Sequence, residues 1–167
     1  MRELLEVDLI LRRGHDISGD ATHYACDAYE FEDALHDDHL ARGLELYRGP
    51  LLDGLYPETA ELQHWLDEER ERYRSLAADA AWTLAERYES KGSDLTSAAR
   101  WARKAAKLAR ADERRIRRVM SLLDRAGDAA GAIDVYEEFA RFLARELDVV
   151  PSEETQAIAR VIRERRE

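Results

Sequence analysis

Four side chains near the N-terminus have the types and the spacing of a zinc site. Two residues separate His23 from Cys26, and two separate His36 from His39. Imidazole and thiolate are the ligands that Zn²⁺ prefers, and four of them complete a structural site. This set holds only one sulfur, and the last two histidines enclose two aspartates, as an exposed loop would. We therefore interpret these residues as a solvated loop and helix start, and we predict no bound metal.

Other patterns that carry catalysis are missing from the sequence. There is no glycine-rich phosphate loop, no Gly-x-Ser-x-Gly elbow and no His-Glu-x-x-His motif. Glu68 and Glu69 have the residue type of an acid–base pair, but their place in a charged helical stretch favours a solvated helix face. The tryptophans could line a binding groove, yet their helical spacing favours core positions. We predict a protein that is not an enzyme and that needs no cofactor.

The strongest candidate for a binding site is a concentration of positive charge. Residues 100–118 contain nine Lys or Arg and two Asp or Glu, within a chain of net charge −10. An acidic chain is a poor general DNA binder, so this island is where an acidic protein surface or a DNA backbone could bind. The alternative is a solvated face paired with acidic neighbours from the preceding long helix. Six of its residues, named here the basic ridge, are predicted to contact a partner: Arg100, Arg103, Lys104, Lys107, Arg114 and Arg118.

Composition indicates the elements that must position these residues. The chain of 167 residues is 37 % charged and 45 % apolar, with 3 prolines and 8 glycines, a mixture that favours helices with exposed polar faces. No window approaches the roughly 20 apolar residues of a membrane span. One cysteine excludes an internal disulfide framework and fits a reducing compartment. We expect a cytoplasmic bacterial protein.

The first part of the chain differs from the rest. Residues 6–13, "EVDLILRR", alternate in polarity, and Gly14 and later turn residues follow, which predicts a short β-hairpin. From Asp27, a candidate N-cap, apolar residues recur at helical spacing up to Tyr47. A break near residues 36–39 is expected to divide this stretch into two short helices.

Five helices are predicted after residue 58. The first is long and ends at Gly92, and the others cover residues 95–111, 113–127, 129–147 and the stretch after Pro151. Asp94, Asp112 and Ser152 stand where helix starts are expected. The predicted core residues are Trp65, Leu84, Tyr88, Ala98, Ala132, Tyr136 and Phe139.

A repeat links these helices. Gly92 and Gly127 are 35 residues apart, and Ala98 and Ala132 are 34 apart. This spacing resembles the tetratricopeptide repeat, a helix–turn–helix unit of about 34 residues. Such hairpins must stack to bury their apolar faces. The predicted fold is therefore all-α: a tetratricopeptide-like stack of helical hairpins in a right-handed superhelix. Such a stack is expected to bind a partner and not to catalyse a reaction.

An apolar run, "LLDGLY", interrupts the pattern at residues 51–56. Pro50 and Gly54 turn the chain there, and we expect Leu51, Leu52, Leu55 and Tyr56 to fold back against the helices. The alternative is an exposed docking patch.

Several stretches, in this order, resemble one family. These are "LELYRGPLLDGLY", "WLDEERERYR", the helical-repeat pair and "YEEFARFLARELDVVPSEETQAI". Together they are similar to the bacterial transcriptional activator domain, the helical domain of regulators of the Streptomyces antibiotic regulatory protein (SARP) type. The resemblance covers about residues 27–163.

The resemblance implies a role and a domain division. In that family the domain usually follows a winged-helix DNA-binding domain, of which residues 7–20 look like the closing hairpin, or wing. We therefore expect residues 1–26 to be a remnant of the wing and linker, in an excised fragment or a natural short form, and residues 27–167 to be the activator domain. The implied partners are RNA polymerase or the protein's own winged-helix domain, with a possible homodimer, while direct DNA reading by this chain is not expected. A sensor of a ligand or peptide, and an adaptor unrelated to transcription, remain as alternatives.

Overall fold

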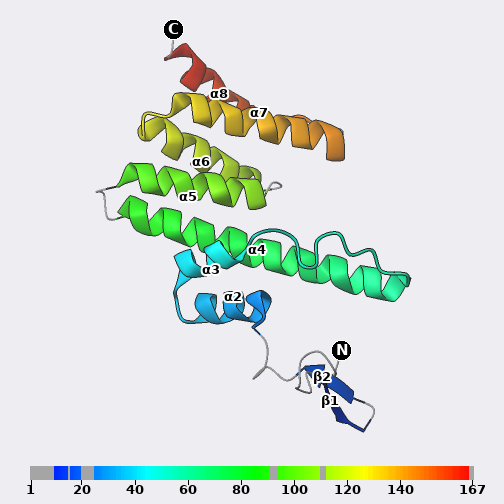
Figure 1. Ribbon diagram of the computed structural model, residues 1–167. Coiled ribbons are helices and arrows are strands. Elements are labelled where there is room, and N and C mark those ends of the chain that lie inside the picture. Colours follow the sequence, from blue (N-terminus) through cyan, green and yellow to red (C-terminus); the bar gives the residue numbers. More distant parts are fainter. Residues whose placement is uncertain (1–9, 15, 20–24, 91–93, 110–111, 166–167) are drawn as a thin grey trace. The chain divides into compact units, whose positions relative to one another are not determined.

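The chain divides into two units, and the first covers residues 1–48. The computed structural model describes residues 10–14, 16–19, 25–90, 94–109 and 112–165. Strands β1 (Ile10–Arg13) and β2 (Asp16–Gly19) pair antiparallel (Figure 1). Gly14 in the turn has a φ of 67°, which glycine adopts without a steric penalty. The predicted N-terminal hairpin is confirmed, but "DISG", which was expected to supply turn residues, forms its second strand.

The predicted break between the two short helices is also confirmed. Helix α2 (Asp27–His36) ends before α3 (Leu40–Leu46) begins. Asp38 has a φ of 62°, and the His39 amide donates to the Ala34 carbonyl at 2.8 Å, which is the geometry of a Schellman C-cap. The predicted N-cap was wrong: Cys26 occupies that position without a side-chain cap, and Asp27 is the first helical residue.

The second unit, residues 49–167, is a stack of helices in chain order (Figure 1). Helix α4 packs against α5, α5 against α6, and α6 against both α7 and α8. The described residues outside the N-terminal hairpin form helices, turns and loops only. The predicted all-α helical stack is therefore confirmed. Its helices are α4 (Ala60–Ser90), α5 (Leu95–Leu108), α6 (Glu113–Arg125), α7 (Ala129–Glu146) and α8 (Glu153–Glu164).

Side-chain caps fix where most of these helices begin. Asp94 accepts a hydrogen bond from the Ser97 amide and Asp112 one from the Arg115 amide, at 2.8 and 3.0 Å. Both predicted starts are thus confirmed, and each cap satisfies an amide that has no partner within its helix. Helix α5 ends at Leu108, earlier than predicted, where the Arg74 guanidinium of α4 donates to its carbonyl. Ala111 and Gly92 lie outside the described residues.

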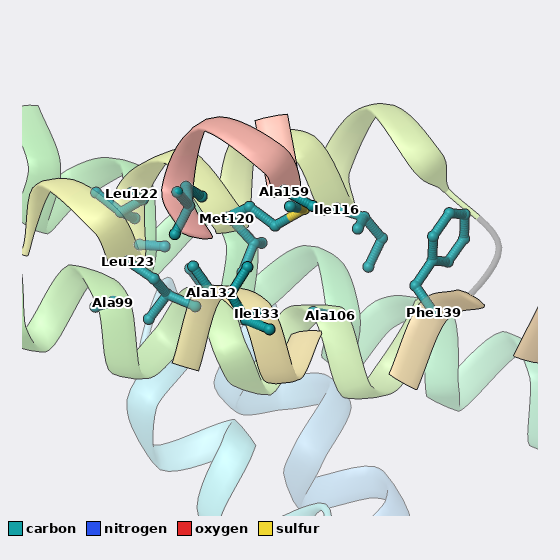
Figure 2. Packing of buried hydrophobic residues seen from close by; sticks show 14 of the residues in the cluster. Ala99, Ala106, Ile116, Met120, Leu122, Leu123, Ala132, Ile133, Phe139 and Ala159 are labelled. Atoms are coloured by element: carbon teal, nitrogen blue, oxygen red, sulfur yellow. The ribbon is translucent and has the colours of Figure 1, made fainter. Parts of the chain in front are cut away.

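Alanines make up much of the core of this unit. Ala98, Ala132 and Phe139 are buried as predicted, whereas Tyr88 and Tyr136 are half-buried at the edge of the cluster. Leu84 is also half-buried. Trp65 was wrongly placed in the core: it is 48 % exposed. The buried face of α4 consists instead mainly of alanines, which let α5 approach closely. Figure 2 shows α6 inserting Ile116, Met120, Leu122 and Leu123 among Ala99 and Ala106 of α5, Ala132 and Ile133 of α7, and Ala159 of α8.

The apolar run before α4 does not fold back as expected. Leu52, Leu55 and Tyr56 are 53, 45 and 85 % exposed, and Leu51 is half-buried. The loop is attached through its backbone instead: the Arg70 guanidinium of α4 donates to the carbonyls of residues 51, 52 and 55 at 2.9, 2.9 and 3.2 Å. The loop is thus fixed to the helix by its carbonyls, while three of the four apolar side chains stay exposed.

Candidate protein-contact surfaces

The structure places the basic ridge on α5 and α6 and separates it into two groups. One group forms ion pairs within the stack. Arg118 of α6 contacts Glu86 and Glu89 of α4 at 2.9 and 3.5 Å, and its guanidinium carbon lies 4.9 Å from the ring centre of Trp82. Exposed ion pairs of this kind contribute less than about 1 kcal/mol each. For Arg118 the predicted alternative, pairing with acidic neighbours of the long helix, matches the geometry.

Arg103 has a second internal role. Its guanidinium pairs with Asp128, the N-cap residue of α7, and its Nε is buried without a hydrogen-bond partner among the described residues. Asp128 also accepts the Gly131 amide at 2.9 Å. A side chain at Gly131 would collide with this guanidinium. Arg103 therefore ties α5 to the start of α7.

The remaining ridge residues lie at the surface. Arg100 and Lys104 approach the Trp101 ring, with distances of 4.9 and 5.8 Å from their charged centres to the ring centre. Lys107, one turn further along α5, and Arg114 in the first turn of α6 are exposed. A cation over an aromatic ring is attracted to the ring and retains its charge. Arg100, Lys104, Lys107 and Arg114 are named here the outer cations.

Two further arginines, which the sequence reasoning did not select, hold α6 in place. Arg115 pairs with Asp79 of α4 at 2.8 Å, and Arg117 pairs with Glu154 of α8 at 3.3 Å. Arg115 lies three residues before Arg118 and so shares its helix face, as Asp79 lies seven residues before Glu86 on α4; this spacing is a signal in the sequence that could have identified Arg115. Most of the charge in α6 is thus used inside the stack.

A small polar cluster joins the starts of α6 and α8. The Ser152 amide donates to Glu113 at 2.7 Å, and Thr155 beside it is fully buried. Burial acts to raise the pKa of Glu113, but hydrogen bonds from Thr155 and Ser152 and the nearby Arg117 together hold that pKa below its ordinary value. The cluster therefore depends on an ionised carboxylate.

A groove of about 590 Å³ lies beside α5 and α7. Its lining includes the apolar Val135, Phe139 and Phe142 together with charged residues of both signs, among them Lys107 and Glu138. Sites for small ligands or peptides are usually concave and combine apolar side chains with polar groups, and this groove has both, with charged residues in the majority.

The imidazole and thiol groups do not assemble into a site in the described part of the chain. Cys26, His36 and His39 belong to no group of three or more possible metal ligands there, and His23 lies outside the described residues. In the same part of the chain, no helix is long and apolar enough to cross a membrane.

The comparison with family models decides the family. The model of the bacterial transcriptional activator domain matches residues 22–163. The chain belongs to this family. The domain is a regulatory one rather than a known catalytic family, and it connects the chain with transcription activation. The comparison with curated proteins finds no match.

Proposed function

We propose that the activator domain acts without catalysis, as a rigid contact module between a DNA-binding module and the transcription machinery. The family match over residues 22–163 is the observation that carries this proposal. The stack supports it, because capped helices joined by ion pairs can hold contact residues at fixed distances. Residues 1–26 are assigned to the wing and linker of a winged-helix module. The domain would act in the cytoplasm, where RNA polymerase is found.

The proposed contact site for an acidic protein surface is the set of outer cations. Arg103 and Arg118 are assigned a positioning role, because both already bind carboxylates of neighbouring helices. Charge complementarity of this kind mainly steers association and makes it sensitive to salt.

Binding to purified RNA polymerase tests the proposal. The triple variant Arg100→Glu/Lys107→Glu/Arg114→Glu should lose most of the binding seen with the unchanged chain at low salt. The control Arg141→Glu/Arg145→Glu/Arg160→Glu changes the net charge equally, at exposed positions on α7 and α8, and should retain it. Equal loss in both variants, or binding that survives in the first, would reject the outer cations as the contact site. Circular dichroism checks that both variants stay helical.

A second function, recognition of a small ligand or peptide, is favoured by the groove beside α5 and α7. A metabolite bound there would raise the melting temperature in proportion to its affinity. Phe142→Ser, which changes an apolar lining residue, should abolish such a shift. A screen without any shift, or shifts that survive this change, would exclude this groove as a sensor.

A further inference from the structure

The segment from residue 50 to residue 69 combines exposed apolar side chains with negative charge. It contains six Asp or Glu and no Lys or Arg, and two of these carboxylates, Asp67 and Glu69, pair with Arg70 and Arg72 just after it. Five of its large apolar residues are between 45 and 85 % exposed: Leu52, Leu55, Tyr56, Leu62 and Trp65. Single exposed apolar residues are ordinary, but several in one segment indicate an interaction site.

The loop half of this segment is held in one conformation. Arg70 binds three of its carbonyls, and the Leu55 amide donates to the Leu52 carbonyl at 3.0 Å. Leu52 has a φ of 49°, a strained value for a residue with a branched side chain. The contacts that maintain this strain leave the Leu52 side chain 53 % exposed, so the loop displays apolar groups from a fixed backbone.

The helical half adds an apolar pair with acidic neighbours. Leu62 and Trp65 are three residues apart on α4, so their side chains share one face. Glu61 and Glu68 lie next to that face, and Glu68 contacts His64 at 3.3 Å. Three of the carboxylates form no ion pair with any residue that the structure describes: Asp53, Glu58 and Glu61. The segment therefore has apolar groups for burial and spare carboxylates around them.

We propose that residues 50–69 form a docking surface for a cationic amphipathic helix of a partner protein. Apolar side chains of such a helix would cover Leu55, Tyr56 and their neighbours, and its Lys or Arg residues would pair with the spare carboxylates. The same carboxylates repel phosphate groups, which argues against nucleic acid and anionic lipid. They would also face one another if two copies met through this surface. This site is independent of the outer cations, which require a partner of the opposite charge.

The experiment uses the full chain and a labelled synthetic peptide of 18 residues, with Leu and Lys placed to form an amphipathic helix. A second peptide has Glu in place of every Lys. Fluorescence anisotropy measures binding of both. The apolar variant is Leu55→Ser/Tyr56→Ser, and its control is Val149→Ser/Val150→Ser, at positions that are 50 and 75 % exposed. The charge variant is Asp53→Lys/Glu58→Lys, and its control, Glu138→Lys/Glu164→Lys, changes the net charge by the same amount.

We expect the Leu/Lys peptide to bind and the Leu/Glu peptide not to bind. The apolar and charge variants should each weaken binding about tenfold, the effect of losing one well-buried apolar group, while both controls stay within about twofold of the unchanged chain. Equal weakening by variants and controls would show a general charge effect and overturn the proposal. Self-association of the chain that Leu55→Ser/Tyr56→Ser abolishes would assign the surface to a second copy instead, and would also overturn it. Neither result bears on binding of RNA polymerase by the outer cations.

Discussion

At the scale of single residues, Asp128 connects three helices. Its amide donates to the Leu123 carbonyl at 2.9 Å, which closes α6 in a Schellman motif with Gly127 at a φ of 81°. Its carboxylate caps α7 through Gly131 and pairs with Arg103 of α5. One side chain thus begins a helix and also fixes that helix to an earlier one.

Replacing Asp128 should therefore cost more than replacing an ordinary cap. We expect Asp128→Ala to lower the free energy of unfolding by about 2 kcal/mol, because both the cap and the partner of Arg103 are lost. Asp128→Asn keeps a capping oxygen and should cost roughly half of that. Urea denaturation measures both. The control Asp134→Ala, at an exposed position on α7, should change stability by less than about 0.5 kcal/mol; an equal loss there would contradict this assignment.

At the scale of helices, we expect the attachment of α8 to α6 to depend on pH. The folded state holds the pKa of Glu113 below its ordinary value of 4.5. A carboxyl group with a lowered folded pKa stabilises the fold above its unfolded pKa, and this contribution disappears as the pH falls through the folded pKa.

The variant Glu113→Gln isolates this contribution. At pH 7 it should be less stable than the unchanged chain, because the ionised partner of Ser152 and Arg117 is lost. The difference should shrink as the pH is lowered past 4.5, where the unchanged chain protonates the same group. Urea denaturation across this range measures both proteins. A difference that stays constant with pH would show that the ionisation of Glu113 does not hold α8.

The helices were predictable from the sequence because their signals are local. Apolar spacing, capping aspartates and the glycine before α7 identify their starts to within a few residues. The end of α5 was not predictable, because Arg74 contacts its last carbonyl from a distant part of the chain; nor was the exposure of Trp65, because spacing alone does not show which turns of a long helix are covered. The same holds for the basic ridge: spacing shows that Arg103 and Arg118 share a charged region, but only the fold shows which carboxylates they meet.

At the scale of the whole molecule, the second unit depends on close contact between alanine-rich faces. Ala102 of α5 is fully buried in the core cluster. Because α5 packs against both α4 and α6, a larger side chain there would push on the stack in both directions.

We expect Ala102→Leu to lower the free energy of unfolding by about 2 kcal/mol, since overpacking forces strained rotamers and backbone shifts. The matched change Ala130→Leu, at an exposed position of α7, should alter it by less than about 0.5 kcal/mol. Urea denaturation compares the two variants. Similar effects at both positions would mean that the α4–α5 contact tolerates extra volume.

The length of α4 has a mechanical consequence. With 31 residues and a rise of about 1.5 Å per residue, α4 is a rod of roughly 46 Å, while α5 has only 14 residues to cover it. The part of α4 beyond α5, against which the Arg70-bound loop lies, would then serve as a spacer. Whatever binds near residue 60 is kept at a set distance from whatever binds the far end of the stack, so the helix acts as a ruler between two partners.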